Sequence, residues 1–133
     1  MKVMQKLKEV MATVPAEDLE RAQKWYADAL GIDPMERRPD GVIYDIGGSH
    51  LLLYPSSFAG TNQATAATLI VDDVRGTADG LREHGVTFEQ FDMPNTTWDR
   101  NVATVSSDGD TFNGAWFRDS EGNIIAITDF STR

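Results

Sequence analysis

The spacing of hydrophobic positions changes along the first half of the chain, and each change predicts an element. Residues 17–31, EDLERAQKWYADALG, carry apolar side chains at helical spacing, with Asp18 placed to cap the first turn and Gly31 placed to end the last. A short apolar-rich stretch at residues 8–15 comes before this helix and is compatible with a strand. Farther on, GVIYDI and SHLLLY flank a Gly-Gly pair, which predicts a hairpin over residues 41–54.

The second half repeats this order. ATAATLIV predicts a strand, and DVRGTADGLREHG predicts a weaker helix, because Gly76 and Gly80 each cost about 1 kcal/mol relative to alanine. VTFEQF alternates as a strand does, and FNGAWFRD and NIIAITDF flank the turn SEGN. Locally the halves align, since Asp18-Leu19 matches Asp73-Val74. The sequence therefore predicts the order strand, helix, strand, strand, strand twice in succession. Each half is too small to cover its own sheet, so we expect the two halves to share one core.

Two loops interrupt this symmetry. Residues 55–63 join the halves, and residues 92–111 form a long polar insert with a short strand expected around Asn101–Val105. Loops of this length in a compact domain are often functional, and variation of a solvated surface is the other interpretation. The pattern leaves both open.

Composition narrows the class of protein. The 133 residues, 41% hydrophobic and 25% charged, fit one domain, and the absence of cysteine excludes disulfides, thiolate catalysis and cysteine-based metal sites. The basic start MKVMQKLKEV lacks the apolar block of a signal peptide, and no apolar run is long enough to span a bilayer, so we expect a cytoplasmic protein without a membrane partner. The formal charge of −9 argues against nucleic acid as a partner and favours a cationic molecule, although solubility alone accounts for it.

Three segments carry a resemblance to a known family: VPAEDLERAQKWYADALG, IVDDVRGTADGLREHGVTFE and AWFRDSEGNIIAI. Together they make the chain resemble the vicinal oxygen chelate superfamily, which includes glyoxalase I, bleomycin-resistance proteins and extradiol dioxygenases. Ser120 stands where that family usually has proline. The resemblance implies an α+β fold in a single domain, residues 1–133. Its two βαβββ modules, about 8–55 and 64–130, would form a curled mixed sheet, a half-barrel around a cavity, with the helices outside.

The resemblance also indicates where metal ligands would stand. Counted from the aligned motifs, the four positions fall on Met11, Leu52, Ala66 and Ala126, which are all apolar. A divalent metal needs oxygen or imidazole donors, and the neighbouring residues offer no better set. We therefore expect no metal and no other cofactor, and the chain is closest to the metal-free branch typified by bleomycin-resistance proteins.

Alternation along the strands, together with the family pattern for Gly114 and Trp116, selects residues for the cavity. Small side chains would leave room, aromatic side chains and Met11 would supply apolar contact, and Thr13, Thr68 and His50 would supply polar anchors. For each residue, ordinary core packing is the competing interpretation, and His50 could instead lie hydrogen-bonded at the hairpin rim. Trp98, in the long loop, could cover a ligand or a dimer partner. The candidate ligand-binding residues are Met11, Thr13, His50, Leu52, Tyr54, Ala66, Thr68, Trp98, Gly114, Trp116 and Ala126.

These expectations point to a metal-independent protein that sequesters an apolar or aromatic small molecule, such as an antibiotic, and that has no catalytic residues. The alternative is a lyase, isomerase or dioxygenase-like enzyme of the same superfamily, with His50 or Tyr54 as acid–base groups. A structural or regulatory module is a third possibility. By resemblance we expect a homodimer, with the pocket either within one chain or between subunits.

Overall fold

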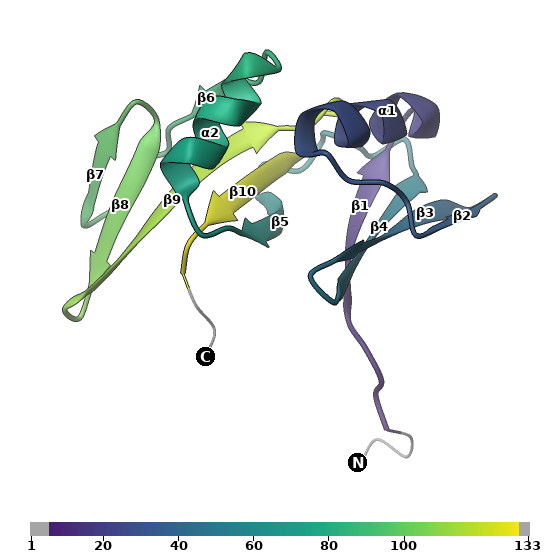
Figure 1. Cartoon of the computed structure of the whole chain (residues 1–133), viewed down its shortest axis with the longest axis horizontal. Coiled ribbons are helices and arrows are strands. Elements are labelled where there is room, and N and C mark those ends of the chain that lie inside the picture. The colour runs from purple at the N-terminus through teal and green to yellow at the C-terminus, as the bar shows by residue number, and fades with distance from the viewer. Residues whose placement is uncertain (1–5, 131–133) are drawn as a thin grey trace.

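The computed structural model describes residues 6–130, and its first module holds one helix over one sheet (Figure 1). The strand order is β1-β4-β3-β2, with β1 parallel to β4 and the other neighbours antiparallel. The elements of this module are β1 (Met11–Ala16), α1 (Leu19–Leu30), β2 (Glu36–Arg38), β3 (Gly41–Ile46) and β4 (Ser49–Pro55).

The second module has the same plan with two added strands. Its sheet has the order β5-β10-β9-β8-β7, and β6 pairs with β9 beside this path. The elements are β5 (Thr65–Ile70), α2 (Val74–Glu83), β6 (Phe88–Glu89), β7 (Thr96–Asp99), β8 (Val102–Ser107), β9 (Asp110–Arg118) and β10 (Ile124–Thr128). Both helices lie on the same side of the molecule, above the sheets (Figure 1). The predicted α+β fold of two βαβββ modules is confirmed, but the strands form two open sheets that meet at β1 and β5 without a hydrogen-bonded ladder between them.

The long insert differs from its prediction. Most of residues 92–111 is not loop, because β7 and β8 form an antiparallel hairpin and β8 continues onto β9. The strand expected around Asn101–Val105 is present as part of β8. Sequence pattern missed β7 because its residues, TTWD, alternate only between half-buried and exposed positions and so show no apolar face. The sequence pattern missed β2 for the same reason, because its residues, ERR, are all exposed.

Both helix starts are confirmed by their caps. The Asp18 carboxylate accepts the backbone N–H of Arg21 at 3.0 Å, and the Asp73 carboxylate accepts that of Gly76 at 3.0 Å. These equivalent caps support the alignment of the two halves. At the end of α1, Gly31 takes the left-handed conformation, with φ of 68°.

The core lies between the helices and the sheets. Alternate strand residues are fully buried on the helix side, as in Val14 and Ala16 of β1 or Ala115 and Phe117 of β9. From α1, Trp25 lies 6.1 Å from the ring of Phe117 in the second module. One hydrophobic cluster therefore extends through both modules, as the shared-core argument predicted. Within residues 6–130, no helix combines the length and the apolar character needed to cross a membrane.

The turn DSEGN, residues 119–123, fastens the second module to the first, and we call it the inter-module turn. Its Glu121 carboxylate accepts the backbone N–H of Asp18 at 2.9 Å and two guanidinium N–H groups of Arg21 at 2.9 and 3.0 Å. The hydroxyl of Ser120 donates to the same carboxylate at 2.8 Å. Burial of this carboxylate would raise its pKa, but these hydrogen bonds and the charge of Arg21 outweigh burial and lower the pKa of Glu121 to about 2.

Asp119 and Asn123 complete the attachment. The buried Tyr26 hydroxyl donates to Asp119 at 2.7 Å, and the Asn123 amide donates to the backbone oxygen of Pro15 at 2.8 Å. Burial and the charge of Asp119 raise the pKa of Tyr26 well above its ordinary value, so the phenol stays protonated as a donor. The backbone N–H of Gly60 donates to the Asn123 side chain at 3.3 Å, which ties the linker to the same turn.

Candidate functional site

A cavity of about 300 Å³ lies on the helix-free face of the second sheet. Its floor crosses three neighbouring strands, because Ala126 of β10 pairs with Thr68 of β5 on one side and with Trp116 of β9 on the other. The next pair along the floor, Thr128 and Gly114, continues it. The lining residues are Thr65, Thr68, Phe112, Gly114, Trp116, Ala126, Ile127, Thr128 and Phe130.

Small residues leave the space of this cavity open, and the absence of a side chain at Gly114 helps to define its shape. A Cβ atom added at Gly114 would lie 3.4 Å from the far edge of the Trp116 ring, so any side chain there would press on the indole or enter the cavity. Ala126, which is 4% exposed, likewise adds only a methyl group to the floor. The space beside Trp116 therefore depends on two positions without bulky side chains.

Aromatic rings flank the cavity. Trp116 lies 6.0 Å from the ring of Trp98 and 5.8 Å from that of Phe91, the latter edge-on at 88°. Toward the other end, Phe112 and Phe130 lie 5.9 Å apart, and Phe130 is 43% exposed. Among residues 6–130 the lining carries no charged side chain, and its polar side chains are the hydroxyls of Thr65, Thr68 and Thr128. This combination favours a ligand with flat apolar faces.

The structure divides the predicted site residues between the two sheets. Thr68, Gly114, Trp116 and Ala126 line the cavity, and Trp98 stacks beside it. The first-module residues lie on their own sheet, where Met11 pairs with His50 and Thr13 with Leu52, and they do not line this cavity. The residues of this separate group are Met11, Thr13, His50, Leu52 and Tyr54.

Ala66 is displaced by a local irregularity. The pairing of β10 with β5 shifts between Ile124 and Ile125. Ile124 pairs with Thr65 and Ile125 pairs with Ala67, so the register passes over Ala66. Simple alternation had placed Ala66 on the side of Thr68. The bulge instead puts Thr65 in the lining, and Ala66 is not part of it.

The four positions of the family's metal ligands do not fit a metal. Met11, Leu52, Ala66 and Ala126 provide no oxygen or nitrogen donor from their side chains, and a lone thioether is a poor ligand for hard divalent ions. Over residues 6–130, no group of three or more His, Asp or Glu side chains is placed to hold a metal ion.

His50 lies hydrogen-bonded at the rim of the β3–β4 hairpin, which was the alternative prediction to a polar anchor in the cavity. Its Nδ1 lies 2.6 Å from a carboxylate oxygen of Glu9, and its side chain is 22% exposed. This contact holds the ring outside the aromatic cavity. Trp25 and Tyr26 of α1 pack between the helix and the sheets, with Trp25 6.1 Å from Phe117 of β9 and Tyr26 6.0 Å from Tyr44 of β3.

Sequence reasoning missed several cavity residues. Phe112 continues the alternation of Gly114 and Trp116 by one step, so the strand pattern could have found it. Phe130 continues the alternation of Ala126 and Thr128 by one step, and Phe91 ends the alternating stretch VTFEQF. The strand pattern could therefore have found both, although β10 ends at Thr128 and β6 at Glu89.

Comparisons with known proteins agree with this fold. The model of the Glyoxalase/Bleomycin resistance protein/Dioxygenase superfamily matches residues 7–127. None of the curated protein sequences compared with the chain matches it.

Among solved structures, UcmS2 is similar with a TM-score of 0.67 and 19% identity, covering 95% of this chain and 100% of its own. TnmS3, described as an antibiotic binding protein from Streptomyces sp. CB03234, has a TM-score of 0.61 and 21% identity over 94% of this chain and 97% of its own. Lactoylglutathione lyase from Agrobacterium tumefaciens has a TM-score of 0.64 and 17% identity over 95% of both chains. At these identities the likeness concerns the fold.

Proposed function

Since the chain belongs to the glyoxalase/bleomycin resistance protein/dioxygenase superfamily, we propose that it binds an apolar or aromatic small molecule without a metal ion. The site we propose is the cavity on the helix-free face of the second sheet. One observation supports this most: Trp116 borders space that Gly114 and Ala126 leave open, in a lining without charge. A core position would have filled that space with side-chain atoms.

The rings define how such a ligand would lie. A planar molecule entering beside Trp116 would contact the indole on one side and the Phe112–Phe130 pair on the other. Aromatic contacts of this kind contribute about 0.5–1.5 kcal/mol each beyond the burial of apolar area. Threonine hydroxyls would fix its orientation. With a formal charge of −9 on the chain, a neutral or cationic ligand is favoured over an anion.

Sequestration of an antibiotic is the specific form of this proposal. It is supported by the fold shared with TnmS3, which is described as an antibiotic binding protein. We further propose that the protein acts in the cytoplasm, by holding its ligand without altering it.

We also propose that the protein is a homodimer. The aromatic cavity is built by one module alone, and Phe130 at its edge is 43% exposed. A second copy that placed its first module, with Leu52 and Tyr54, over this opening would enclose the ligand. Sedimentation velocity at micromolar concentration should show twice the chain mass of 14.7 kDa, and a species of 14.7 kDa alone would contradict the dimer.

The alternative is an enzyme of the same fold, as the lactoylglutathione lyase neighbour illustrates. It would require His50 or Tyr54 to reach the ligand, and within one chain neither lines the aromatic cavity. Product formation that is abolished in His50→Ala would favour the enzyme. A ligand recovered unchanged after long incubation would favour sequestration.

Titration with 2-naphthol, a neutral planar probe, tests the binding site through tryptophan fluorescence. We expect saturable one-to-one quenching that is lost in Gly114→Leu and in Ala126→Leu, because both side chains would fill the cavity. Trp25→Phe is the matched control, since Trp25 lies on the helix side against Phe117 and its removal should leave the quenching intact. Equal quenching in a folded Gly114→Leu variant would place the probe elsewhere and contradict the proposal. Antibiotics would then be screened with the same readout.

A further inference from the structure

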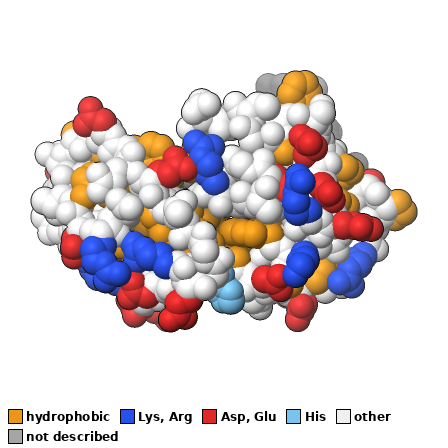
Figure 2. All heavy atoms as spheres, turned by 90° about the horizontal axis from the view of Figure 1, so that it is seen from above, with side chains coloured by type: hydrophobic (Ala, Val, Ile, Leu, Met, Phe, Trp, Pro, Cys, Tyr) orange, Lys and Arg blue, Asp and Glu red, His pale blue; other side chains and the backbone are white. Residues whose placement is uncertain are grey.

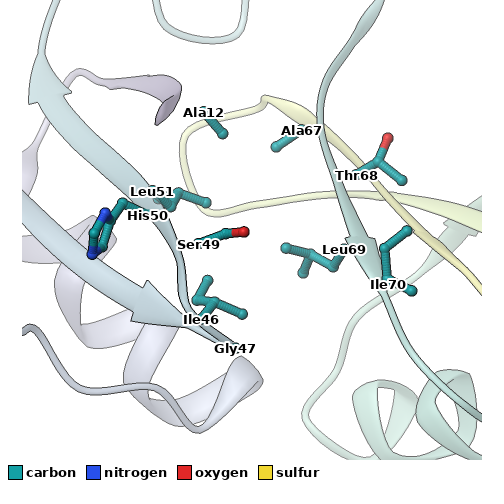
Figure 3. Close-up of a pocket in the computed structure, with 10 residues that line it drawn as sticks. All are labelled: Ala12, Ile46, Gly47, Ser49, His50, Leu51, Ala67, Thr68, Leu69 and Ile70. Atoms are coloured by element: carbon teal, nitrogen blue, oxygen red, sulfur yellow. The ribbon is translucent and has the colours of Figure 1, made fainter. Parts of the chain in front are cut away.

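A second cavity, of about 420 Å³, lies in the cleft between the two modules. We propose that this cleft is a separate binding site for a neutral aliphatic molecule that carries one hydrogen-bonding group. Its walls are Ala12, Ile46 and Leu51 from the first module and Ala67, Leu69 and Ile70 from the second (Figure 3).

The cleft exists because, among residues 6–130, the side-chain hydrogen bonds that join the modules gather at one end of the shared core. The inter-module turn joins them near Asp18 and Pro15. At the opposite end, the β3–β4 hairpin and β5 have no strand pairing between them. Val14 of β1 is fully buried, whereas Ala12, two residues earlier on the same face, is exposed because the cover of the core ends there. Seen from above, hydrophobic side chains are visible between the two halves of the molecule (Figure 2).

The chemistry of the lining identifies the class of occupant. All its larger apolar side chains are aliphatic, and the only ring in the lining, among residues 6–130, is the His50 imidazole, so the cleft offers no apolar ring for stacking, unlike the aromatic cavity. The Ser49 hydroxyl points into the cleft toward Leu69, while the His50 ring turns away from it (Figure 3). Among residues 6–130 the lining contains no Lys, Arg, Asp or Glu. Its one ionisable side chain is His50, whose Nδ1 already contacts a carboxylate oxygen of Glu9 at 2.6 Å, and the volume lies within the range of small-molecule sites. A neutral aliphatic ligand with a hydroxyl or carbonyl group directed at Ser49 matches these features.

Strand β5 separates this site from the aromatic cavity. The Ala67 and Leu69 side chains point toward the first module, whereas those of Thr68 and Ile70 point to the other side of β5, although both residues also belong to the lining of the cleft (Figure 3). On that other face Thr68 pairs with Ala126 in the floor of the aromatic cavity. The two sites therefore adjoin along β5 and share Thr68, and they differ in chemistry, aliphatic in one and aromatic in the other.

Methyl NMR with 1-octanol as the probe tests the inference on the full chain. We expect saturable shifts of the Ile46, Leu51 and Leu69 methyl signals, with the Trp116 indole signal unchanged. Ala12→Phe should abolish these shifts by filling the cleft from an exposed position. Val10→Phe, two residues earlier, 89% exposed and outside both linings, is the matched control and should keep them. Ser49→Ala should weaken 1-octanol binding by about 2- to 10-fold through loss of one hydrogen bond.

Several outcomes would overturn the inference. Shifts that do not saturate, or that persist in Ala12→Phe, would mean that 1-octanol does not occupy the cleft. Methyl signals that move on dilution without any probe, together with absence of binding, would mean that a second copy of the chain covers it. Circular dichroism checks the fold of each variant, and Ser49→Leu supplies a second filling variant at an exposed position if Ala12→Phe fails to fold.

Discussion

Replacing Glu121 with glutamine tests whether the inter-module turn stabilises the fold through a buried charge. The carboxylate receives hydrogen bonds from the backbone N–H of Asp18, from Arg21 and from Ser120, and its side chain is 0% exposed. Glutamine keeps the shape but removes the charge, and its NH₂ group would face donors. We expect Glu121→Gln to lower the free energy of unfolding at pH 7.

The magnitude follows from the pKa. Folding lowers the pKa of Glu121 from 4.5 to about 2. At roughly 1.4 kcal/mol for each tenfold change in proton affinity, this difference corresponds to about 3 kcal/mol as an upper value. Because Arg21 is 53% exposed, solvent weakens its share, and a loss of about 2–3 kcal/mol is expected.

The sign of the pH dependence is fixed by the direction of the change. Since the folded state holds the lower pKa, the stabilisation is complete above pH 4.5 and is lost as the pH falls toward 2. Urea unfolding of both proteins between pH 7 and pH 2.5 should therefore show a difference in free energy that shrinks steadily below pH 4.5.

A control and a refuting result accompany this experiment. Asp28→Asn removes the ion pair with Lys24, and because the two side chains are 60% and 79% exposed, the free energy of unfolding should stay nearly unchanged at each of these pH values. If Glu121→Gln lost less than about 1 kcal/mol at pH 7, or the same amount at pH 7 and pH 2.5, the charge would not be the source of stability.

Two further pairs of substitutions test the packing, each by urea unfolding at pH 7. Tyr26→Phe removes the 2.7 Å hydrogen bond to the buried Asp119 carboxylate and should lower the free energy of unfolding by about 1.5–3 kcal/mol. Tyr44→Phe should leave the free energy of unfolding unchanged or raise it by up to about 1 kcal/mol, because the buried Tyr44 hydroxyl has no partner among residues 6–130. A comparable loss in both variants would contradict this difference. Gly60→Ala should lower the free energy of unfolding by about 2 kcal/mol or more, because φ is +75° and a Cβ would lie 2.6 Å from the backbone oxygen of Glu121. Gly80→Ala should raise the free energy of unfolding by about 0.5–1 kcal/mol, because a Cβ at this position of α2 meets open space. Equal effects at the two glycines would show that backbone geometry at Gly60 is not limiting.

Local chemistry made much of the fold predictable. Asp18 and Asp73 precede helical apolar spacing and can satisfy free N–H groups of the first turn, and the structure has both caps. In the site, the family pattern directed Gly114, Trp116 and Ala126 inward, and alternation from the first strand position of the second module added Thr68; all four line the cavity. These features depend on residues close in sequence, so local pattern and family resemblance together reveal them.

The features that pattern missed depend on contacts between distant residues. Nothing near Ala66 in sequence signals the bulge, which arises where β5 adjusts to β10. Strand β7 forms because β8 offers a partner, despite side chains that show no buried face. The cleft between the modules results from how two units are fastened together, which no single segment encodes.

The difference between these two kinds of feature explains why the sequence identifies the family more clearly than the ligand. The recognisable turn, residues 119–123, joins the modules by hydrogen bonds to Asp18, Tyr26 and Pro15, so its residues are constrained by the architecture. The aromatic cavity begins elsewhere, at Gly114 and Trp116, where a changed side chain would alter the ligand without breaking that joint. A match to the turn therefore indicates the scaffold, and only the lining can indicate what is bound.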